Sequence, residues 1–366
     1  MSWFAISNIE TIDTPALVIY AERVKENIRL LKSMVKDIGQ VRPHVKTNKM
    51  AEVCSMMLEA GIRKFKCATI AEAEMLALIN APDILLAYQP VGPKVLRLIH
   101  LVKNYPGTNF SCLVDNEISA RYIADQFAAN GLKISVFIDL DVGMHRTGIA
   151  TQQALQLAKD IQILDGIELI GLHLYDGQIT DADLQVRQQK SDQGFGAALT
   201  IAQQIEAAFA IKVKIVAGGS PSLPTHLLRE GVECSPGTFV FWDWGYKHGF
   251  PDEPFDYAAL VITRVISVIN EHTLCLDLGH KAVAAENPLP RVYFLNAPDL
   301  VPVSQSEEHM VVKSAEKHGY KVGDVLYGVP VHICPTVALY DIAWVVEHGA
   351  VSKDWKVIGR NRYITI

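Results

Sequence analysis

Short runs of β-branched and other apolar residues alternate with stretches of helical spacing from about residue 14 to residue 235. This alternation is typical of a parallel α/β domain, because a helix usually connects one parallel strand to the next. We predict nine strands there, at 14–20, 40–46, 64–68, 83–88, 110–114, 133–139, 167–174, 213–217 and 231–235. A closed barrel takes eight strands. We therefore expect the first strand to lie outside the barrel and to pair with whatever follows it.

After residue 248 the helical spacing fades, and β-rich runs such as ALVITRVISVI and RVYFLN follow one another. Runs of this kind are typical of an antiparallel β-domain. We predict an α/β fold with a (β/α)8 TIM barrel at 21–247 and a mostly antiparallel β-domain formed by 1–20 and 248–366. The length of 366 residues fits a barrel of about 250 residues with a smaller domain.

Charge and cysteine usage narrow the class of partner. The net charge is -6, and no run of lysine or arginine occurs, which argues against nucleic acid or a membrane surface and favours small molecules. The six cysteines occur singly without CxxC pairs, as in a reducing compartment. The chain also shows neither a signal-peptide pattern nor an apolar run of the roughly 20 residues that span a bilayer. We expect a cytoplasmic protein.

Lys46 lies in the segment RPHVKTNK, where the first predicted barrel strand ends. A lysine that is fixed on a rigid element and partly desolvated can lose its proton near neutral pH and attack a carbonyl carbon. Lys46 is therefore a candidate Schiff-base lysine.

Two glycine-containing loops follow the last two predicted barrel strands. One contains Gly219 and Ser220, and the other contains Gly237 and Thr238. Barrels commonly bind a phosphate at these two positions, because glycine lets backbone N–H groups approach its oxygens. A tight turn would explain either loop alone, but the two together predict a phosphate-bearing ligand opposite Lys46. Pyridoxal 5'-phosphate (PLP) carries both a phosphate and an aldehyde.

Two further side chains follow barrel strands on the same face. Arg146, in GMHRTG, could hold the phenolate oxygen of PLP, although a loop arginine could equally pair with Asp139 or Asp141. Tyr175, in GLHLYDGQ, could pack against the cofactor or simply cap the barrel core. The sequence leaves both alternatives open.

His332 and Cys334 stand two residues apart in GVPVHICPT, which we predict to be extended, so that both side chains point to one face. Imidazole and thiolate ligands suit a borderline-soft divalent metal, zinc above all. Spacing alone also allows a buried histidine beside a buried free cysteine. The polar stretch LDLGHKAVAAENP, which contains Asp277, His280 and Glu286, could support the metal ligands.

The segments RPHVKTNK, GMHRTG, GGSP, SPGT and HICPT, in this order, resemble the fold-type III PLP enzymes that group D-threonine aldolase with D-serine dehydratase. The resemblance runs nearly end to end. It implies an alanine-racemase-like barrel with a β-domain, and a homodimer whose active site lies at the subunit interface. It also implies that Lys46 is the Schiff-base lysine and that a divalent metal (zinc, manganese or magnesium) is bound, with further residues around the phosphate and the metal: Gly219, Ser220, Gly237, Thr238, His332 and Cys334.

The chain departs from the family pattern at two positions. Many members have a histidine where this chain has Asn48, and many have Tyr-x-Gly-His where this chain has Gln178. A histidine that could act as a base in relatives is therefore absent at 178. His-x-Cys resembles the dehydratase branch, whereas YDGQ and DLGHKAVAAENPLPR resemble the aldolases.

We therefore expect a metal-dependent lyase on D-β-hydroxy amino acids, with D-threonine aldolase as the first hypothesis and D-serine dehydratase as the alternative. An amino-acid racemase is a weaker hypothesis, because it has no use for a metal. A noncatalytic PLP-binding barrel would end near residue 240. A PLP-independent Schiff-base aldolase for sugar phosphates is the remaining possibility.

Overall fold

The computed structural model of the chain describes residues 2–366 and divides into two compact units. Unit 1 contains the residues up to Leu31, Thr47–Val53 and Thr238–Arg360, and unit 2 contains Lys32–Lys46, Cys54–Gly237 and Asn361–Ile366. The predicted domain bounds of 21–247, and of 1–20 with 248–366, stay a prediction, since compactness alone does not define a domain boundary.

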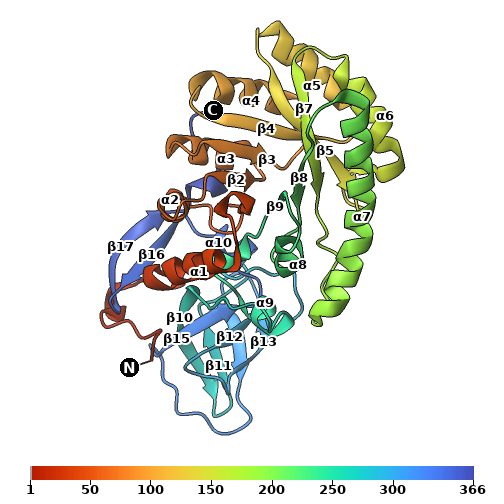
Figure 1. The fold of residues 1–366 in the computed structure, drawn as a ribbon. Helices are drawn as coiled ribbons and strands as arrows, with labels where there is room; N and C mark the ends of the chain where they lie inside the picture. Colours follow the sequence, from red (N-terminus) through yellow and green to blue (C-terminus); the bar gives the residue numbers. More distant parts are fainter. Residues whose placement is uncertain (1) are drawn as a thin grey trace. The chain divides into compact units, whose positions relative to one another are not determined.

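Unit 2 is built on a parallel sheet (Figure 1). Its strands, in spatial order, are β2 (Lys64–Cys67), β3 (Asp83–Leu86), β4 (Asn109–Val114), β5 (Ile134–Asp141), β7 (Ile167–Leu174), β8 (Lys214–Ala217) and β9 (Val232–Cys234). The two-residue strand β6 (Ile149–Ala150) pairs with β5. Each of the seven strands lies at a run that the sequence predicted as a strand.

The segment 41–46 joins the two edges of this sheet and closes the barrel. Val41 forms a parallel bridge with Cys234 of β9, and His44 forms one with Lys66 of β2. The ladder is interrupted because Pro43 has no N–H group to donate, although its carbonyl oxygen accepts a hydrogen bond from the Lys66 N–H at 2.9 Å. The predicted strand 40–46 is thus present as two bridges, and the prediction of an eight-membered barrel is confirmed.

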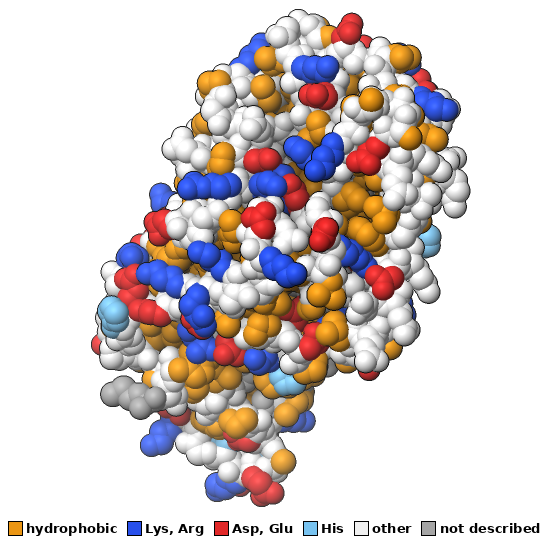
Figure 2. Space-filling model, viewed as in Figure 1, with side chains coloured by type: hydrophobic (Ala, Val, Ile, Leu, Met, Phe, Trp, Pro, Cys, Tyr) orange, Lys and Arg blue, Asp and Glu red, His pale blue; other side chains and the backbone are white. Residues whose placement is uncertain are grey.

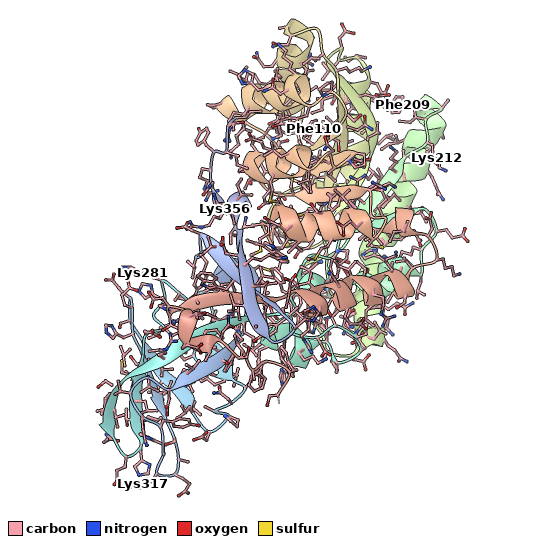
Figure 3. The ribbon with its side chains drawn as sticks, turned by 90° about the vertical axis from the view of Figure 1, so that its left-hand side faces the viewer. Phe110, Phe209, Lys212, Lys281, Lys317 and Lys356 are labelled. Carbon is pink, nitrogen blue, oxygen red and sulfur yellow. The ribbon has the colours of Figure 1, made fainter. Side chains whose placement is uncertain are left out.

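Helices follow the barrel strands and cover the outside of the sheet (Figure 1). They are α3 (Ile70–Leu78), α4 (Pro93–Asn104), α5 (Glu117–Ala129), α6 (Thr151–Gln162), α7 (Leu184–Phe209) and α8 (Leu223–Leu227). Their starts are set by local side chains: Thr69 caps α3 and Asn116 caps α5, each accepting a hydrogen bond from a backbone N–H of the first turn. Figure 3 shows Phe209 at the end of α7, next to the loop that contains Lys212 and leads to β8.

The inside of the barrel begins with a charged layer where the strands start. The Arg42 guanidinium lies 2.6 Å from carboxylate oxygens of both Asp83 and Glu233, and Lys64 lies 2.5 Å from the second oxygen of Glu233. Because each buried charge has an opposite charge and hydrogen bonds, the desolvation penalty is offset. An apolar cluster also lies among the barrel strands, formed by Leu85, Leu113, Phe137 and Val216.

Unit 1 is an antiparallel β-domain with one parallel pair. Its strands are β1 (Ala16–Tyr20), β10 (Ala259–Asn270), β11 (Thr273–Leu276), β12 (Val292–Phe294), β13 (Val301–Gln305), β14 (Met310–Lys313), β15 (Val325–Pro330), β16 (Ile342–Glu347) and β17 (Ala350–Lys356). β1 pairs with β10 and with β16. The expectation that the first strand lies outside the barrel is confirmed.

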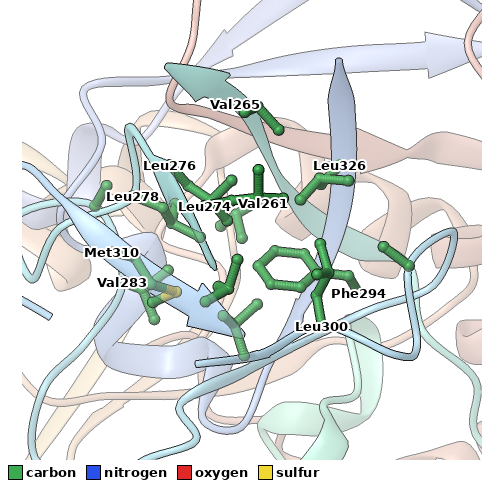
Figure 4. Packing of buried hydrophobic residues seen from close by; sticks show 14 residues of the cluster. Val261, Val265, Leu274, Leu276, Leu278, Val283, Phe294, Leu300, Met310 and Leu326 are labelled. Atoms are coloured by element: carbon green, nitrogen blue, oxygen red, sulfur yellow. The ribbon is translucent and has the colours of Figure 1, made fainter. Parts of the chain in front are cut away.

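A buried apolar cluster packs among five strands of unit 1, namely β10, β11, β12, β14 and β15 (Figure 4). Val261, Leu274 and Phe294 come from three different strands and are almost fully buried. Burial of this kind stabilises the domain by roughly 25 cal/mol per Å² of apolar surface removed from water. Farther along the sheet, Lys317 marks a loop tip in Figure 3 and pairs with Glu271 of the β10–β11 turn.

The remaining helices are short or are shared between the units. α1 (Ala21–Met34) and α2 (Ala51–Glu59) each contain residues of both units, whereas α9 (Trp244–Gly249) and α10 (Ile333–Val337) belong to unit 1. Within residues 2–366 no helix is both long and apolar enough to cross a bilayer. On the face drawn in Figure 2, positive and negative side chains are interspersed, in keeping with the modest net charge of -6.

Candidate active site

Three cationic side chains surround the ring of Tyr175, which follows β7. The Nζ atoms of Lys46 and Lys66 lie 5.6 and 5.8 Å from the ring centroid, and the guanidinium carbon of Arg146 lies 5.2 Å from it. In residues 2–366 neither Lys46 nor Arg146 makes an ion pair with a carboxylate. A concentration of positive charge of this kind favours an anionic ligand.

The acidic residues near Arg146 have other partners. Asp139 contacts His173 at 2.7 Å, and Asp141 contacts His145 at 2.7 Å. The alternative that Arg146 is a loop arginine paired with Asp139 or Asp141 is therefore not what the structure shows. Arg146 lines a cavity of about 500 Å³ together with Lys46 and His44. Two of the predicted strand-end residues of unit 2, Lys46 and Arg146, thus line one cavity.

The loop after β8 is held by a buried carboxylate. Asp176 accepts a hydrogen bond from the Ser222 hydroxyl at 2.6 Å and lies 2.8 Å from Nε2 of His226. The same hydroxyl accepts a hydrogen bond from the Gly219 N–H. At Gly218 the backbone has a φ of +71°, and an added Cβ would lie 2.5 Å from the His226 ring. The glycines are therefore required by the shape of this loop.

The second glycine loop contacts the first. The Gly237 N–H donates a hydrogen bond to the Ser220 hydroxyl at 3.2 Å, and a Cβ on Gly219 would lie 2.9 Å from the Tyr175 ring. The Ser235 hydroxyl is buried and has no hydrogen-bond partner within the described chain. A buried polar group without a partner is unfavourable, and a polar atom of a bound ligand would satisfy it. The Thr238 hydroxyl lies 3.5 Å from Sγ of Cys334, and its place at the phosphate stays a prediction.

These observations fit PLP. Lys46 and Arg146 line the cavity, and the Tyr175 ring lies near both. The two glycine loops contact each other, one of them contacts this ring, and the buried Ser235 hydroxyl has no partner in the described chain. Each element of that set comes from unit 2.

A buried hydrogen-bonded chain connects three barrel strands behind Tyr175. Lys66 Nζ lies 3.3 Å from Nε2 of His173, and Nδ1 of His173 lies 2.7 Å from Asp139. Burial and then the positive charge of Lys46 lower the pKa of Lys66 to about 7. Burial raises the pKa of Asp139, but the neighbouring His173 outweighs it, so that the pKa is lowered overall. Sequence reasoning missed this chain; its signal was Lys64 and Lys66, spaced as inward-facing residues in a barrel strand.

The HICPT segment is not extended, and the prediction that it is was wrong. His332 caps α10, and Cys334 lies in its first turn. The helix starts there because Pro330 ends β15 and the buried Asp243 accepts a hydrogen bond from the Ile333 N–H at 3.0 Å. The two side chains nevertheless hydrogen-bond to each other.

The His332–Cys334 pair has the features of a ligand pair. Glu286 lies 2.7 Å from Nδ1 of His332, which leaves Nε2 for other contacts. Burial raises the pKa of Cys334, but the hydrogen bond from His332 outweighs it, so that the thiol pKa is lowered. Burial lowers the pKa of His332, but the Cys334 contact, with Asp243 and Glu286, raises it to about 9. The Thr47 hydroxyl lies 3.1 Å from Sγ.

The donor set suits zinc, since one imidazole and one thiolate are borderline-soft ligands. Within residues 2–366 no group of three or more His, Cys, Asp or Glu side chains is arranged to hold a metal ion.

The Gln178 side chain contacts the loop that leads to Arg146. Its Nε2 donates a hydrogen bond to the Val142 carbonyl oxygen at 3.0 Å. The amide is exposed and supports the backbone of this loop. It provides no base.

Residues 19–242 match the family model of the alanine racemase N-terminal domain, which is more than half of the 366 residues. The chain belongs to this family. Residues 258–346 also match the model of a domain attributed to serine dehydratases.

Curated relatives of this alanine-racemase-type chain cover nearly its whole length. It is 27% identical to a D-threonine aldolase of Arthrobacter (95% of this chain, 93% of the relative) and 28% identical to a 3-hydroxy-D-aspartate aldolase of Paracoccus denitrificans (96% and 93%). It is 25% identical to a D-threo-3-hydroxyaspartate dehydratase of Delftia (94% and 97%).

Solved structures of other proteins share this fold. A D-threonine aldolase from Filomicrobium marinum superposes with a TM-score of 0.89 at 22% identity, with 98% of each chain covered. The fold-type III class and the family resemblance that the sequence predicted are thereby confirmed.

Proposed function

We propose that the chain is a PLP-dependent lyase that acts on D-β-hydroxy amino acids, and that its reaction is the cleavage of D-threonine to glycine and acetaldehyde. The observation that supports this best is the cavity that contains Lys46, with Arg146 and the Tyr175 ring beside it. When bound, PLP supplies an electron sink for a carbanion at Cα of an amino acid.

The residues of unit 2 would each have a defined task. Lys46 supplies the amine that binds the aldehyde carbon, and Arg146 holds an anionic oxygen of the cofactor by charge. Tyr175 offers a face for the pyridine ring. Gly219, Ser220 and Gly237 surround the phosphate, for which their loops provide N–H and O–H donors.

His332 and Cys334 would hold a divalent metal, most suitably zinc, with manganese or magnesium as alternatives. Such a metal lowers the pKa of a coordinated hydroxyl group, which is the chemistry that aldol cleavage needs at the β-oxygen. Glu286 orients the imidazole, and Thr47 contributes a hydroxyl beside the sulfur. The side-chain amide of Gln178, which donates a hydrogen bond to the Val142 carbonyl oxygen, would not serve as a base in the cleavage.

Dehydration of a D-hydroxy amino acid to a 2-oxo acid and ammonia is the second candidate. It is favoured by the His-x-Cys pair, since that pair resembles the dehydratase branch. It would use the amine of Lys46 to remove the Cα proton. An amino-acid racemase is a weaker alternative, because a metal held by His332 and Cys334 would have no role in it.

We further propose a cytoplasmic homodimer that takes small-molecule D-amino acids, as the family resemblance implies. Light scattering on the purified protein measures its molar mass and so tests the proposed dimer. A monomer at micromolar concentration would contradict it.

The cofactor assignment is tested by absorbance. The purified protein, supplied with PLP, should absorb near 410 to 430 nm, and borohydride followed by peptide mapping should place the cofactor on Lys46. Lys46→Ala should abolish the band and the labelled peptide, whereas Lys190→Ala, which removes a surface lysine paired with Asp181, should change neither. Labelling at another lysine, or no band, would contradict the proposal.

A further inference from the structure

Ser235 is a buried serine directly after β9, and the proposed function gives it no task. The residue is 3% exposed, and its hydroxyl makes no hydrogen bond with any group in residues 2–366. Its N–H continues the sheet beyond β9, because it donates to the Ala217 carbonyl oxygen of β8 at 3.2 Å. A buried hydroxyl without a partner is unfavourable unless a ligand supplies one.

The direction of the Ser235 side chain follows from the strand before it. Side chains two residues apart on a strand lie on the same face. Glu233 stands two residues earlier and points into the barrel, where its carboxylate contacts Arg42 and Lys64. The Ser235 hydroxyl therefore also lies on the inside of the barrel, one layer nearer to the carboxyl ends of the strands.

The neighbours of β9 are the two elements that carry the proposed cofactor groups. β9 pairs with β8, whose following loop contains Gly219 and Ser220, and it is bridged to the segment 41–46, which ends at Lys46. A ligand held by both elements would lie at the end of the barrel interior that the Ser235 hydroxyl faces.

PLP has four polar groups, and the proposed function provides partners for three of them: the phosphate, the aldehyde and the phenolate oxygen. The pyridine nitrogen is left, and its usual partners in proteins are aspartate and arginine. The buried charged groups of the barrel interior already have protein partners; they are Arg42, Lys66, Asp139, Asp176 and Glu233. The Ser235 hydroxyl is the inward-facing group that still needs one.

We propose that the Ser235 hydroxyl binds the pyridine nitrogen of PLP through a hydrogen bond. A hydroxyl can donate to that nitrogen without bringing a charge, whereas an aspartate would place a negative charge beside it. Hydrogen bonds to ring nitrogens are one means by which a protein tunes the electronic properties of a cofactor. This inference rests on the proposed function, because PLP supplies the nitrogen.

The test compares PLP with its 1-deaza analogue, in which a CH group replaces the ring nitrogen, by equilibrium binding to the cofactor-free protein. The wild type should bind PLP about tenfold more tightly than the analogue, because the analogue leaves the hydroxyl unpaired. Ser235→Ala should bind PLP about tenfold more weakly than the wild type does, and it should show no preference for PLP over the analogue. Neither measurement requires turnover.

Thermal unfolding distinguishes a cofactor contact from a structural role. Removal of an unpaired buried hydroxyl relieves a penalty, so the unfolding midpoint of cofactor-free Ser235→Ala should rise by about 1 °C. With PLP at saturation the order should reverse, because the wild type binds PLP more tightly. A serine with only a structural role would instead lower the midpoint by the same amount with and without PLP when it is replaced.

Ser111→Ala is the matched control. Ser111 is a buried serine of β4, but its hydroxyl donates to the Ile84 carbonyl oxygen at 3.5 Å. Its replacement should keep the tenfold preference for PLP. Ser235→Cys keeps the size of the side chain with a much weaker donor, and it should lose the preference as Ser235→Ala does, should the alanine variant not fold.

The outcomes separate the two proposals. If the wild type binds neither PLP nor the analogue, the proposed function fails, and this inference fails with it. If the wild type binds PLP but does not distinguish it from the analogue, the inference alone is overturned. The same holds if Ser235→Ala keeps the preference for PLP.

Discussion

Nε2 of His173 lies 3.3 Å from Nζ of Lys66, in the interior of the barrel, and this contact holds a lysine that is 2% exposed. The pKa of Lys66 is lowered to about 7, chiefly by burial, from 10.5 for an exposed lysine. The folded state therefore disfavours the charged amine. This penalty is fully present below pH 7 and disappears as the pH rises toward 10.5.

Lys66→Met should accordingly stabilise the fold in a pH-dependent way. The free energy of unfolding should rise by up to about 5 kcal/mol below pH 7, and the gain should shrink at pH 8 and again at pH 10. Urea unfolding at the three pH values measures it. Lys64→Met, which removes a paired lysine, should instead lose stability by about 1 kcal/mol at each pH. A gain in Lys66→Met that does not depend on pH would contradict the assignment of the penalty to the buried charge.

Gly218 and Gly231 both have a φ of +71°, but their surroundings differ. A Cβ at Gly231 meets nothing within 4 Å, whereas one at Gly218 would lie 2.5 Å from His226 and 2.7 Å from Ser222. Gly231→Ala should lose about 1 kcal/mol of stability from the backbone alone, and Gly218→Ala should lose about 2 kcal/mol more from the clash. Gly218→Ala should also weaken PLP binding at least about tenfold, because it distorts the loop of Gly219. Equal PLP affinities in the two variants, measured by fluorescence titration, would contradict the proposal that this loop binds the phosphate.

Cys334→Ala should abolish turnover and keep the PLP band, because the thiol belongs to the pair that we propose as metal ligands. Chelation of the wild type should have the same effect, and added zinc or manganese should restore activity. Cys275→Ala, which removes a half-buried cysteine of β11, is the control and should keep both properties. Full activity after exhaustive chelation, with metal content checked by mass spectrometry, would exclude the metal role.

Glu286→Gln tests the orientation of His332. The carboxylate lies 2.7 Å from Nδ1, and loss of such a partner typically weakens metal binding about 10- to 100-fold. Metal affinity measured with a competing chelator should fall by that factor. Glu308→Gln, which removes an exposed partner of Lys281, should leave it unchanged. Similar affinities in the two variants would mean that Glu286 has no part in metal binding.

The barrel could be predicted from the sequence because its strands are short apolar runs between helices. The segment 41–46 could be placed although Pro43 reduces it to two bridges, because its register follows from its neighbours. The α10 helix could not be predicted: its start depends on Asp243, which is 90 residues away from Ile333 in the chain. Such a long-range cap leaves no local pattern.

The site was predictable where one residue type has a distinctive chemistry. Lys46 and the glycine loops stand at strand ends, and strand counting is enough to bring them to one end of the barrel. The Lys66–His173–Asp139 chain could not be found in this way, because its residues come from three strands and each looks ordinary in its own segment. The only sign of this chain in the sequence is the spacing of Lys64 and Lys66, which stand two residues apart on one strand. The assignment of Thr238 to the phosphate, made from its loop, stays a prediction; its hydroxyl lies 3.5 Å from Sγ of Cys334.

The most direct measurement of the central claim is a product analysis with D-threonine and D-serine, supplied separately to the PLP-loaded protein with zinc or manganese. The account predicts glycine and acetaldehyde in equal amounts from D-threonine, no such products from L-threonine, and neither product in Lys46→Ala. Formation of a 2-oxo acid and ammonia instead would establish the dehydratase alternative, and no reaction with either D-amino acid would contradict the proposed function.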